Sequence, residues 1–458
     1  MNFLYKYSKS IEFLFLLFLF GTLSFGRAFS IFGITTSLIP LFITETFLFI
    51  SVPLIIVNYK NISNKFTKIF LIFITIYFVF GCFYLFLGLI NKNLFALRDI
   101  VLCGYILFLP IAFIIFSNLK NLKVFLFILF LSNLINLMVG RFLILDVYPS
   151  ITIYNFISKT KFFNLGLYYG IAVSFLICFY NYLRLKTFRF LALVLLSLNL
   201  YMLIVVGVRT LWVATISLII FLFFVLKKKI MKLFVRFILI FLLVSSILFY
   251  LDFIISGSLE MKMASGKAKS LTLFLDIATK TFVAEKLPTA EKLPFEVKAR
   301  LDNIIWRLKV WRGALKFGLK SFIWGRGFGI YPRYEIWGYH EPQGIGIDSG
   351  IIPTHNHLIS IFYKMGVVGL SLFLFVNIYV FFFALRHLRI SNSEFIKCFL
   401  TGSLGVFIFW HTMALFFDVI DSPPTSIFLW IIMGAIFAVI EIDKESKKEK
   451  TKWNLKAK

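Results

Sequence analysis

The sequence predicts an all-α protein that crosses a membrane about 12 times. Of its 458 residues, 60% are hydrophobic and only 15% are charged, whereas a soluble domain has about 25% charged residues. This composition excludes a soluble enzyme and a disordered chain. The apolar residues also occur in runs of roughly 20, the length of a helix that spans a bilayer. These runs predict spans at 11–33, 36–57, 67–90, 98–117, 123–140, 162–182, 189–208, 210–226, 233–251, 356–385, 395–417 and 425–441.

The basic residues indicate how these spans are oriented. The net charge is +27, and Lys and Arg concentrate in the short loops on the cytoplasmic side of membrane proteins. One set of alternating segments is rich in them, with Lys60, Lys65, Lys68, Arg184, Lys186, Arg189, Lys227, Lys228, Lys229, Arg386, Arg389 and the tail after Lys444. The other short loops contain only Arg27, Lys92, Arg98, Arg141, Lys159, Lys161 and Arg209. We therefore expect both termini in the cytoplasm, an uncleaved first span and no nucleic-acid partner.

One long polar segment interrupts the series of spans. It lies on the exterior side between the ninth and tenth spans, where long loops cross the membrane regardless of their charge. The chain is expected to divide into helices 1–9 at 1–251, the exterior loop with amphipathic helices at 252–355, helices 10–12 at 356–441 and a basic tail at 442–458. Because a loop of this length in a compact protein usually carries function, we expect the functional site in or beside it.

The exterior loop contains an amphipathic helix pattern at about 296–322. A basic stripe recurs every three or four residues beside an apolar face, which comprises Leu301, Ile304, Leu308, Trp311, Leu315 and Leu319. Such a helix lies along the membrane surface, with the stripe of Lys309, Arg312, Lys316 and Lys320 near headgroup phosphates. Arg300 and Arg307 are two turns apart and project away from the stripe, either toward a ligand or simply into solvent.

Charged residues inside predicted spans are functional candidates, because a charge is costly in hydrocarbon. Glu45 lies in mid-span, where pairing with an arginine such as Arg27 is the structural alternative. Arg209 lies at the exterior end of a span, where it either binds a ligand or extends its charged end to the membrane surface.

Two histidines lie where the exterior loop enters the tenth span. His355 and His357 occur in the sequence THNHLIS, and a histidine with a near-neutral pKa is suited to proton transfer. A histidine pair without a cysteine or carboxylate at matching spacing does not form a typical metal site. We therefore expect no metal ion.

Phosphate is the predicted ligand of the exterior arginines. The planar guanidinium group suits a diphosphate, and Arg209, Arg307 and Arg326 all lie on the exterior side. The nearby Gly325-x-Gly327-x-Gly329 stretch allows a tight turn or a close approach to a ligand. It follows no predicted strand, so it does not indicate a dinucleotide site. The chain has neither a Walker motif nor an evident glycosidase acid pair.

Residues 307–370 resemble the C-terminal signature of the O-antigen ligase and polymerase superfamily. The matching elements are Arg307-xxx-Trp311 followed by Ala314-Leu315, the Gly325-x-Gly327-x-Gly329 stretch, and His355-Asn356 followed by Gly366-Val367-Val368-Gly369-Leu370. An arginine at the end of a span also matches. It reads Val208-Arg209-Thr210, where the family usually has serine before and glycine after. The layout of twelve spans with a long loop between the ninth and tenth extends the resemblance over the whole chain.

The resemblance implies a glycosyltransferase of the bacterial inner membrane that needs no metal ion, nucleotide or other cofactor. The exterior loop is then periplasmic, and the donor is a glycan on undecaprenyl diphosphate. By similarity, Arg209 and Arg307 neutralise the diphosphate, and His355 activates the acceptor hydroxyl or assists the leaving group. The expected substrate-binding residues are Arg300, Arg312, Arg326, Trp311, Asn356 and His357, and the sequence does not decide which of the two histidines is essential.

Several functions remain open at this stage. A ligase transfers the polysaccharide to a hydroxyl of lipid A-core, whereas a polymerase extends another lipid-linked glycan. A single dominant loop favours the ligase, and a protein O-glycosyltransferase with the same carrier is a third enzyme. A flippase or transporter would instead be expected to have charged spans, internal repeats and short loops. The sugars, the stereochemistry and the oligomeric state are not readable from these residues.

Overall fold

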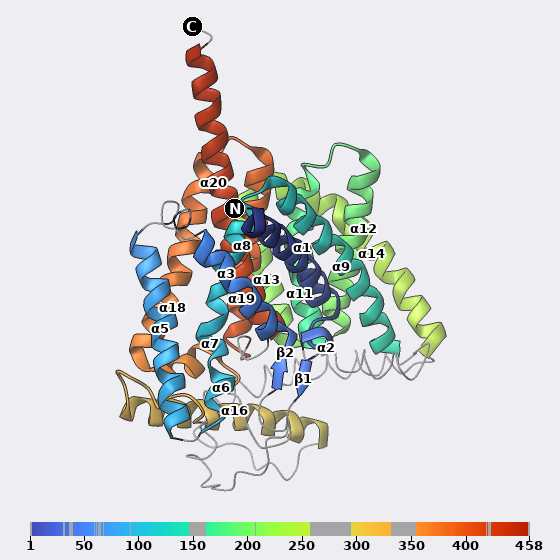
Figure 1. Ribbon diagram of the computed structural model, residues 1–458. Helices are drawn as coiled ribbons and strands as arrows, with labels where there is room; N and C mark the ends of the chain where they lie inside the picture. Colours follow the sequence, from blue (N-terminus) through green and yellow to red (C-terminus); the bar gives the residue numbers. More distant parts are fainter. Residues whose placement is uncertain are drawn as a thin grey trace.

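The computed structural model describes residues 2–30, 33–35, 40–58, 60, 62, 66, 68–91, 93–145, 162–206, 208–256, 295–330, 354–417, 419 and 423–456. Helices dominate these residues (Figure 1). In chain order they are α1 (Asn2–Phe25), α2 (Arg27–Ser30), α3 (Ile43–Val57), α5 (Lys68–Ile90), α6 (Ala96–Asp99), α7 (Val101–Gly104), η1 (Tyr105–Leu107), α8 (Phe108–Phe116), α9 (Leu119–Leu145), α11 (Phe162–Tyr180), α12 (Lys186–Val205), α13 (Arg209–Leu226), α14 (Lys228–Ser256), α16 (Phe295–Lys320), α18 (His357–Ile390), α19 (Glu394–Ala414) and α20 (Pro423–Lys456).

The predicted fold class, a helical protein that spans a membrane several times, is confirmed. Among the described residues, eight helical segments are long and apolar enough to cross a bilayer. Three shorter apolar segments, at Ile43–Val57, Leu165–Tyr180 and Arg236–Leu248, lie in α3, α11 and α14. Each expected span overlaps a helix or, for 98–117, the consecutive short helices α6 to α8. The number of spans stays a prediction.

The first two spans differ from the expected ranges. Helix α1 begins before residue 11 and ends at Phe25, because Gly26 has a φ of 50° and turns the chain out of the helix. A small antiparallel pair then joins β1 (Gly33–Thr35) to β2 (Pro40–Phe42), with Thr35 opposite Pro40. Helix α3 therefore starts at Ile43, later than expected.

Helix α20 lies at the centre of the bundle and packs on α8, while α19 packs against α11 and α13. The contact between α20 and α8 is close, because a Cβ added at Gly434 would lie 2.2 Å from the carbonyl oxygen of Leu109. Trp410 and Trp430 are fully buried in this core. Helix α5 lies at the edge of the bundle and exposes many large apolar side chains, as expected for a helix that faces lipid.

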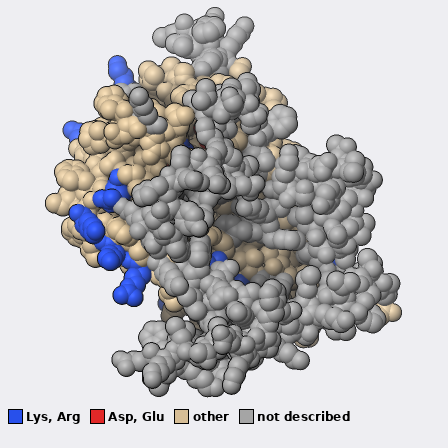
Figure 2. Space-filling model, turned by 90° about the horizontal axis from the view of Figure 1, so that it is seen from below, with Lys and Arg blue, Asp and Glu red and all other residues tan. Residues whose placement is uncertain are grey.

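Helix α16 is the helix that the sequence predicted at about 296–322. Its buried side differs from the predicted apolar face, because Leu308, Leu315 and Leu319 are exposed whereas Val310 and Ala314 are buried. The helix lies across one end of the bundle, and α20 ends on the opposite side (Figure 1). Its 26 residues correspond to about 39 Å of helix. Arg312, Lys316 and Lys320 of the predicted basic stripe are exposed. Viewed from the α16 side, the coloured surface carries Lys and Arg along one edge and shows no Asp or Glu (Figure 2).

Candidate functional site

The candidate site forms where α18 begins, beneath α16. Asn356 is the N-cap residue of α18, and its side-chain oxygen accepts a hydrogen bond from the backbone N–H of Ile359 at 3.0 Å. Its side-chain amide donates to the carbonyl oxygen of Leu415, at the end of α19, at 2.8 Å. The same residue therefore starts α18 and attaches it to α19.

His355 is held immediately before this cap. Its φ of 53° is one of two positive values among the described non-glycine residues, and such a backbone persists only where its surroundings impose it. Trp311 of α16 donates its indole N–H to the carbonyl oxygen of Thr354 at 2.7 Å. The Thr354 hydroxyl donates to the carbonyl oxygen of Asn356 at 2.8 Å. Trp311 thus positions the segment that carries His355.

Arg307 and His355 contact the same aromatic ring. The guanidinium carbon of Arg307 lies 5.4 Å from the ring centroid of Phe417, and the His355 ring lies 6.0 Å from it in an edge-on arrangement. The two residues are far apart in sequence, and α16 and the start of α18 bring them together. The structure thus places the two residues that the sequence singled out against one ring, and their catalytic role stays a prediction.

Arg307 combines partial burial with a hydrogen-bond donor that has no partner among the described residues. It is partly buried on the bundle side of α16, and burial lowers the pKa of its guanidinium group. Its Nε atom is buried without a hydrogen-bond partner among the described residues. A buried donor without a partner is costly unless a ligand supplies the acceptor.

The three glycines of the Gly325-x-Gly327-x-Gly329 stretch have positive φ values. They form the glycine loop, residues 321–330, which docks against an interruption in α18 at Gly366, where φ is 65° and ψ is −167°. The N–H of Arg326 donates to the carbonyl oxygen of Tyr363 at 2.7 Å, and that of Gly327 donates to Lys364 at 2.9 Å. The predicted tight turn therefore serves backbone-to-backbone contact.

These contacts leave no room for side chains at two of the glycines. A Cβ at Gly325 would lie 2.4 Å from the Gly366 nitrogen, and one at Gly366 would lie 2.2 Å from the carbonyl oxygen of Ile323. A hydrogen bond also runs in the opposite direction, because the N–H of Val367 donates to the carbonyl oxygen of Phe322 at 2.8 Å. The glycine loop thus supplies hydrogen bonds to backbone groups that the interrupted helix does not pair itself.

A buried ion pair, not anticipated from the sequence, fastens the same region. Lys364 Nζ lies 2.8 Å from Asp99 Oδ1, and their side chains are only 3% and 2% exposed. The other oxygen of Asp99 accepts a hydrogen bond from the N–H of Gly329 at 2.7 Å. Asp99 thereby joins α6, the glycine loop and α18. Both charges fall inside predicted spans, so the criterion that selected Glu45 would have found them.

The remaining candidates lie in different settings. Arg209 is the first residue of α13, and Arg326 lies on the glycine loop. Arg312 is exposed on α16, and the side chain of Arg300 is outside the described residues. His357 is fully buried, with its ring 5.0 Å from that of Phe373, and neither ring nitrogen has a hydrogen-bond partner among the described residues.

Glu45 accepts a hydrogen bond from the Tyr105 hydroxyl at 2.5 Å. The side chain of Arg27, its suggested partner, lies outside the described residues.

The fold and the site define a polytopic membrane protein with a cationic site at one end of its bundle, under an amphipathic helix. Residues 191–374 match the family model described as O-antigen ligase, in agreement with the resemblance seen in the sequence motifs. The matched range contains Arg209, Arg307, the glycine loop, His355 and the Gly366 interruption. No curated protein matches the chain significantly.

Proposed function

We propose that this protein is an O-antigen ligase that transfers a polysaccharide from undecaprenyl diphosphate to a hydroxyl of lipid A-core, at the periplasmic face of the bacterial inner membrane. The observation that carries the proposal is the placement of Arg307 and His355 against the ring of Phe417, beneath a helix that lies across the end of the spans. The family match supports a glycosyl transfer that uses a lipid-linked glycan.

In the proposed reaction, the bond between the anomeric carbon of the glycan and the diphosphate oxygen breaks. The oxygen of the acceptor hydroxyl forms the new bond to that carbon, and its proton moves to a ring nitrogen of His355. The diphosphate leaves with the bonding electron pair, and Arg307 stabilises the added negative charge. The products are the glycosylated acceptor and undecaprenyl diphosphate.

Arg307 suits this role because its position is partly desolvated and its direction is set in advance. A charge–charge interaction is stronger in a site with little water than in bulk solvent. Helix α16 holds Arg307 one turn before Trp311, the residue that positions the His355 segment. The cation and the proton-transfer group are therefore placed by one rigid element. Arg209 would be a second cation for the diphosphate.

The test is transfer by the purified full-length protein from a defined undecaprenyl-diphosphate glycan to lipid A-core. EDTA is present and no nucleotide is added. We expect product with the wild type and a loss of at least about 100-fold with His355→Ala and Arg307→Ala. Arg389→Ala is the control, because Arg389 is exposed in the last turn of α18, at the other end of the bundle.

The products distinguish the alternatives. Glycan on lipid A-core identifies a ligase, whereas longer carrier-linked chains identify a polymerase and overturn the ligase assignment. Glycan found only on an added protein acceptor identifies a protein O-glycosyltransferase. Folded protein that transfers no glycan to any of these acceptors contradicts the proposed enzyme activity and favours a transporter.

A further inference from the structure

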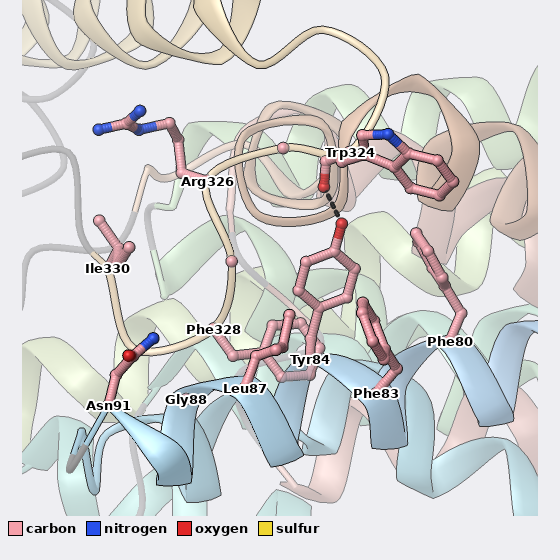
Figure 3. A pocket seen from close by; sticks show the side chains of 12 residues that line it. Phe80, Phe83, Tyr84, Leu87, Gly88, Asn91, Trp324, Arg326, Phe328 and Ile330 are labelled. Atoms are coloured by element: carbon pink, nitrogen blue, oxygen red, sulfur yellow. Dashed lines mark hydrogen bonds between the residues drawn. The ribbon is translucent and has the colours of Figure 1, made fainter.

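An elongated cavity of about 580 Å³ lies between the outer helix α5 and the glycine loop. One wall is formed by α5 residues from Phe80 to Gly88, with Asn91 just beyond the helix, and the other by loop residues from Trp324 to Ile330 (Figure 3). The Tyr84 hydroxyl donates a hydrogen bond across the cavity to the carbonyl oxygen of Trp324. We call this cavity the α5 groove.

The α5 groove is aromatic at one end, and at the other end it carries two polar side chains together with Ile330. Phe80, Phe83 and Trp324 gather at one end, whereas Arg326 and Asn91 lie at the other (Figure 3). Phe80 precedes Asn91 by eleven residues, so the two ends are separated by about 16 Å along α5. The apolar end lies toward the middle of this span, and the polar end lies where the span finishes.

The groove also faces the surface that the bilayer covers. Phe83 is 51% exposed and Trp324 is 59% exposed, although both are large apolar side chains. The neighbouring Phe86, which does not line the groove, is 62% exposed on the same helix. A ligand can therefore enter the groove sideways from lipid, with its apolar part toward the bilayer interior and its polar part toward the surface.

We propose that the α5 groove binds the isoprenoid chain of the lipid-linked donor, with a donor phosphate beside Arg326. The aromatic rings match a hydrocarbon chain, and the arginine matches an anionic headgroup. The groove is lined by one helix and one loop and has a volume of about 580 Å³, which suits one hydrocarbon chain better than the two chains of a phospholipid. The identity of the lipid rests on the proposed function; the presence of a single-chain anionic lipid rests on the groove alone.

The polar end of the groove contacts α18, the helix that begins at the candidate site. Arg326 is bonded through its backbone to Tyr363, and Tyr363 lies six residues after His357 on α18. This corresponds to a rise of about 9 Å along the helix. A lipid held in the groove therefore has its headgroup beside the segment of α18 that begins at the site.

The test is direct binding of undecaprenyl diphosphate to the purified full-length protein, measured by native mass spectrometry in detergent. Phe83→Ser removes a ring that lines the groove, and Phe86→Ser removes an exposed ring from the same helix outside the groove. We expect roughly tenfold weaker binding for Phe83→Ser, since an apolar side chain of this size loses its burial, and no change for Phe86→Ser. Equal effects of the two substitutions would overturn the proposal.

The identity of the occupant is tested separately. Phosphatidylglycerol that binds as tightly as undecaprenyl diphosphate, with the same sensitivity to Phe83→Ser, would show a phospholipid groove and overturn the donor assignment. Arg326→Gln should weaken binding of undecaprenyl diphosphate but not of undecaprenol, which lacks phosphate. Equal weakening of both would overturn the assigned role of Arg326.

Measurements of donor binding and of glycan transfer separate the groove proposal from the proposed enzyme activity. His355→Ala should retain wild-type binding of undecaprenyl diphosphate while it loses transfer. Binding that depends on Phe83 in a protein without transferase activity would support the groove and contradict the enzyme. Transfer with unchanged donor affinity in Phe83→Ser would contradict the groove and leave the enzyme in place.

Discussion

Replacing Lys364 with methionine removes the cation that faces Asp99 in the interior of the bundle. The two side chains are 2.8 Å apart and almost completely buried. In the variant the carboxylate keeps its hydrogen bond from the N–H of Gly329 but loses the ion pair with Lys364. We expect the protein to be destabilised and the glycine loop to detach from α18.

The size of the expected loss in stability follows from the burial of the Lys364–Asp99 pair. Leaving one charge of a buried pair uncompensated costs about 3–5 kcal/mol, and the remaining hydrogen bond to Asp99 places Lys364→Met near the lower end of that range. Asp99→Asn should cost a similar amount, because it removes the negative charge that faces the ammonium group. The double variant Asp99→Asn/Lys364→Met buries no charge. It should therefore be more stable than the sum of the single changes predicts, by about 3 kcal/mol.

The assay is reversible unfolding of the purified protein in mixed detergent micelles, followed by tryptophan fluorescence for the wild type, both single variants and the double variant. Lys397→Met is the matched control, because Lys397 forms an exposed pair with Glu394 at 3.5 Å. An exposed pair contributes at most about 1 kcal/mol. Strictly additive losses in the double variant, or a Lys364→Met variant as stable as Lys397→Met, would refute the reasoning.

Three further substitutions test the geometry around this region. Gly366→Ala places a Cβ against the Ile323 carbonyl oxygen and should cost about 2–4 kcal/mol; unchanged unfolding would show that the interruption is not required. Trp311→Phe removes the hydrogen bond to Thr354 and should lower the free energy of unfolding by about 1 kcal/mol. We also expect the transfer rate to fall more than the affinity for the donor. A proportional fall in both would contradict the role of Trp311 in positioning His355. Asn356→Ala removes the cap of α18 and should cost about 0.5–2 kcal/mol, measured by the same unfolding assay, and Asn356→Asp should restore part of that loss if capping is its function.

Hydrophobic and amphipathic periodicity predicted much of this fold. The spans are long apolar runs, and the periodicity around Trp311 predicted the helix α16, because both signals depend only on neighbours in the sequence. Which side of α16 is buried depends on its packing, and Val310 and Ala314 are buried there in place of the predicted leucines. The β1–β2 pair escaped notice because its strands have three residues each. Arg307 and His355 were correctly expected on the same side, but their shared contact with Phe417 depends on how three helices pack.

The residues that form hydrogen bonds with the glycine loop could not be predicted from the sequence. Its hydrogen bonds to Tyr363 and Lys364 join segments that are distant along the chain, and no local pattern indicates them. The two histidines were separable in principle, since Asn356 is a typical N-cap residue. An N-cap there makes His357 the first helical residue, and in the structure it enters the core while His355 stays outside the helix.

The interruption of α18 at Gly366 has a consequence for membrane insertion. Irregular backbone at membrane depth is tolerated only when protein groups satisfy its hydrogen bonds, and here the glycine loop provides several of them. The loop precedes α18 in the chain, so during synthesis it emerges from the ribosome before its partner. Residues 357–366 can therefore reach their final conformation only when the glycine loop lies against them, which makes the folding of α18 depend on a segment that is synthesised earlier.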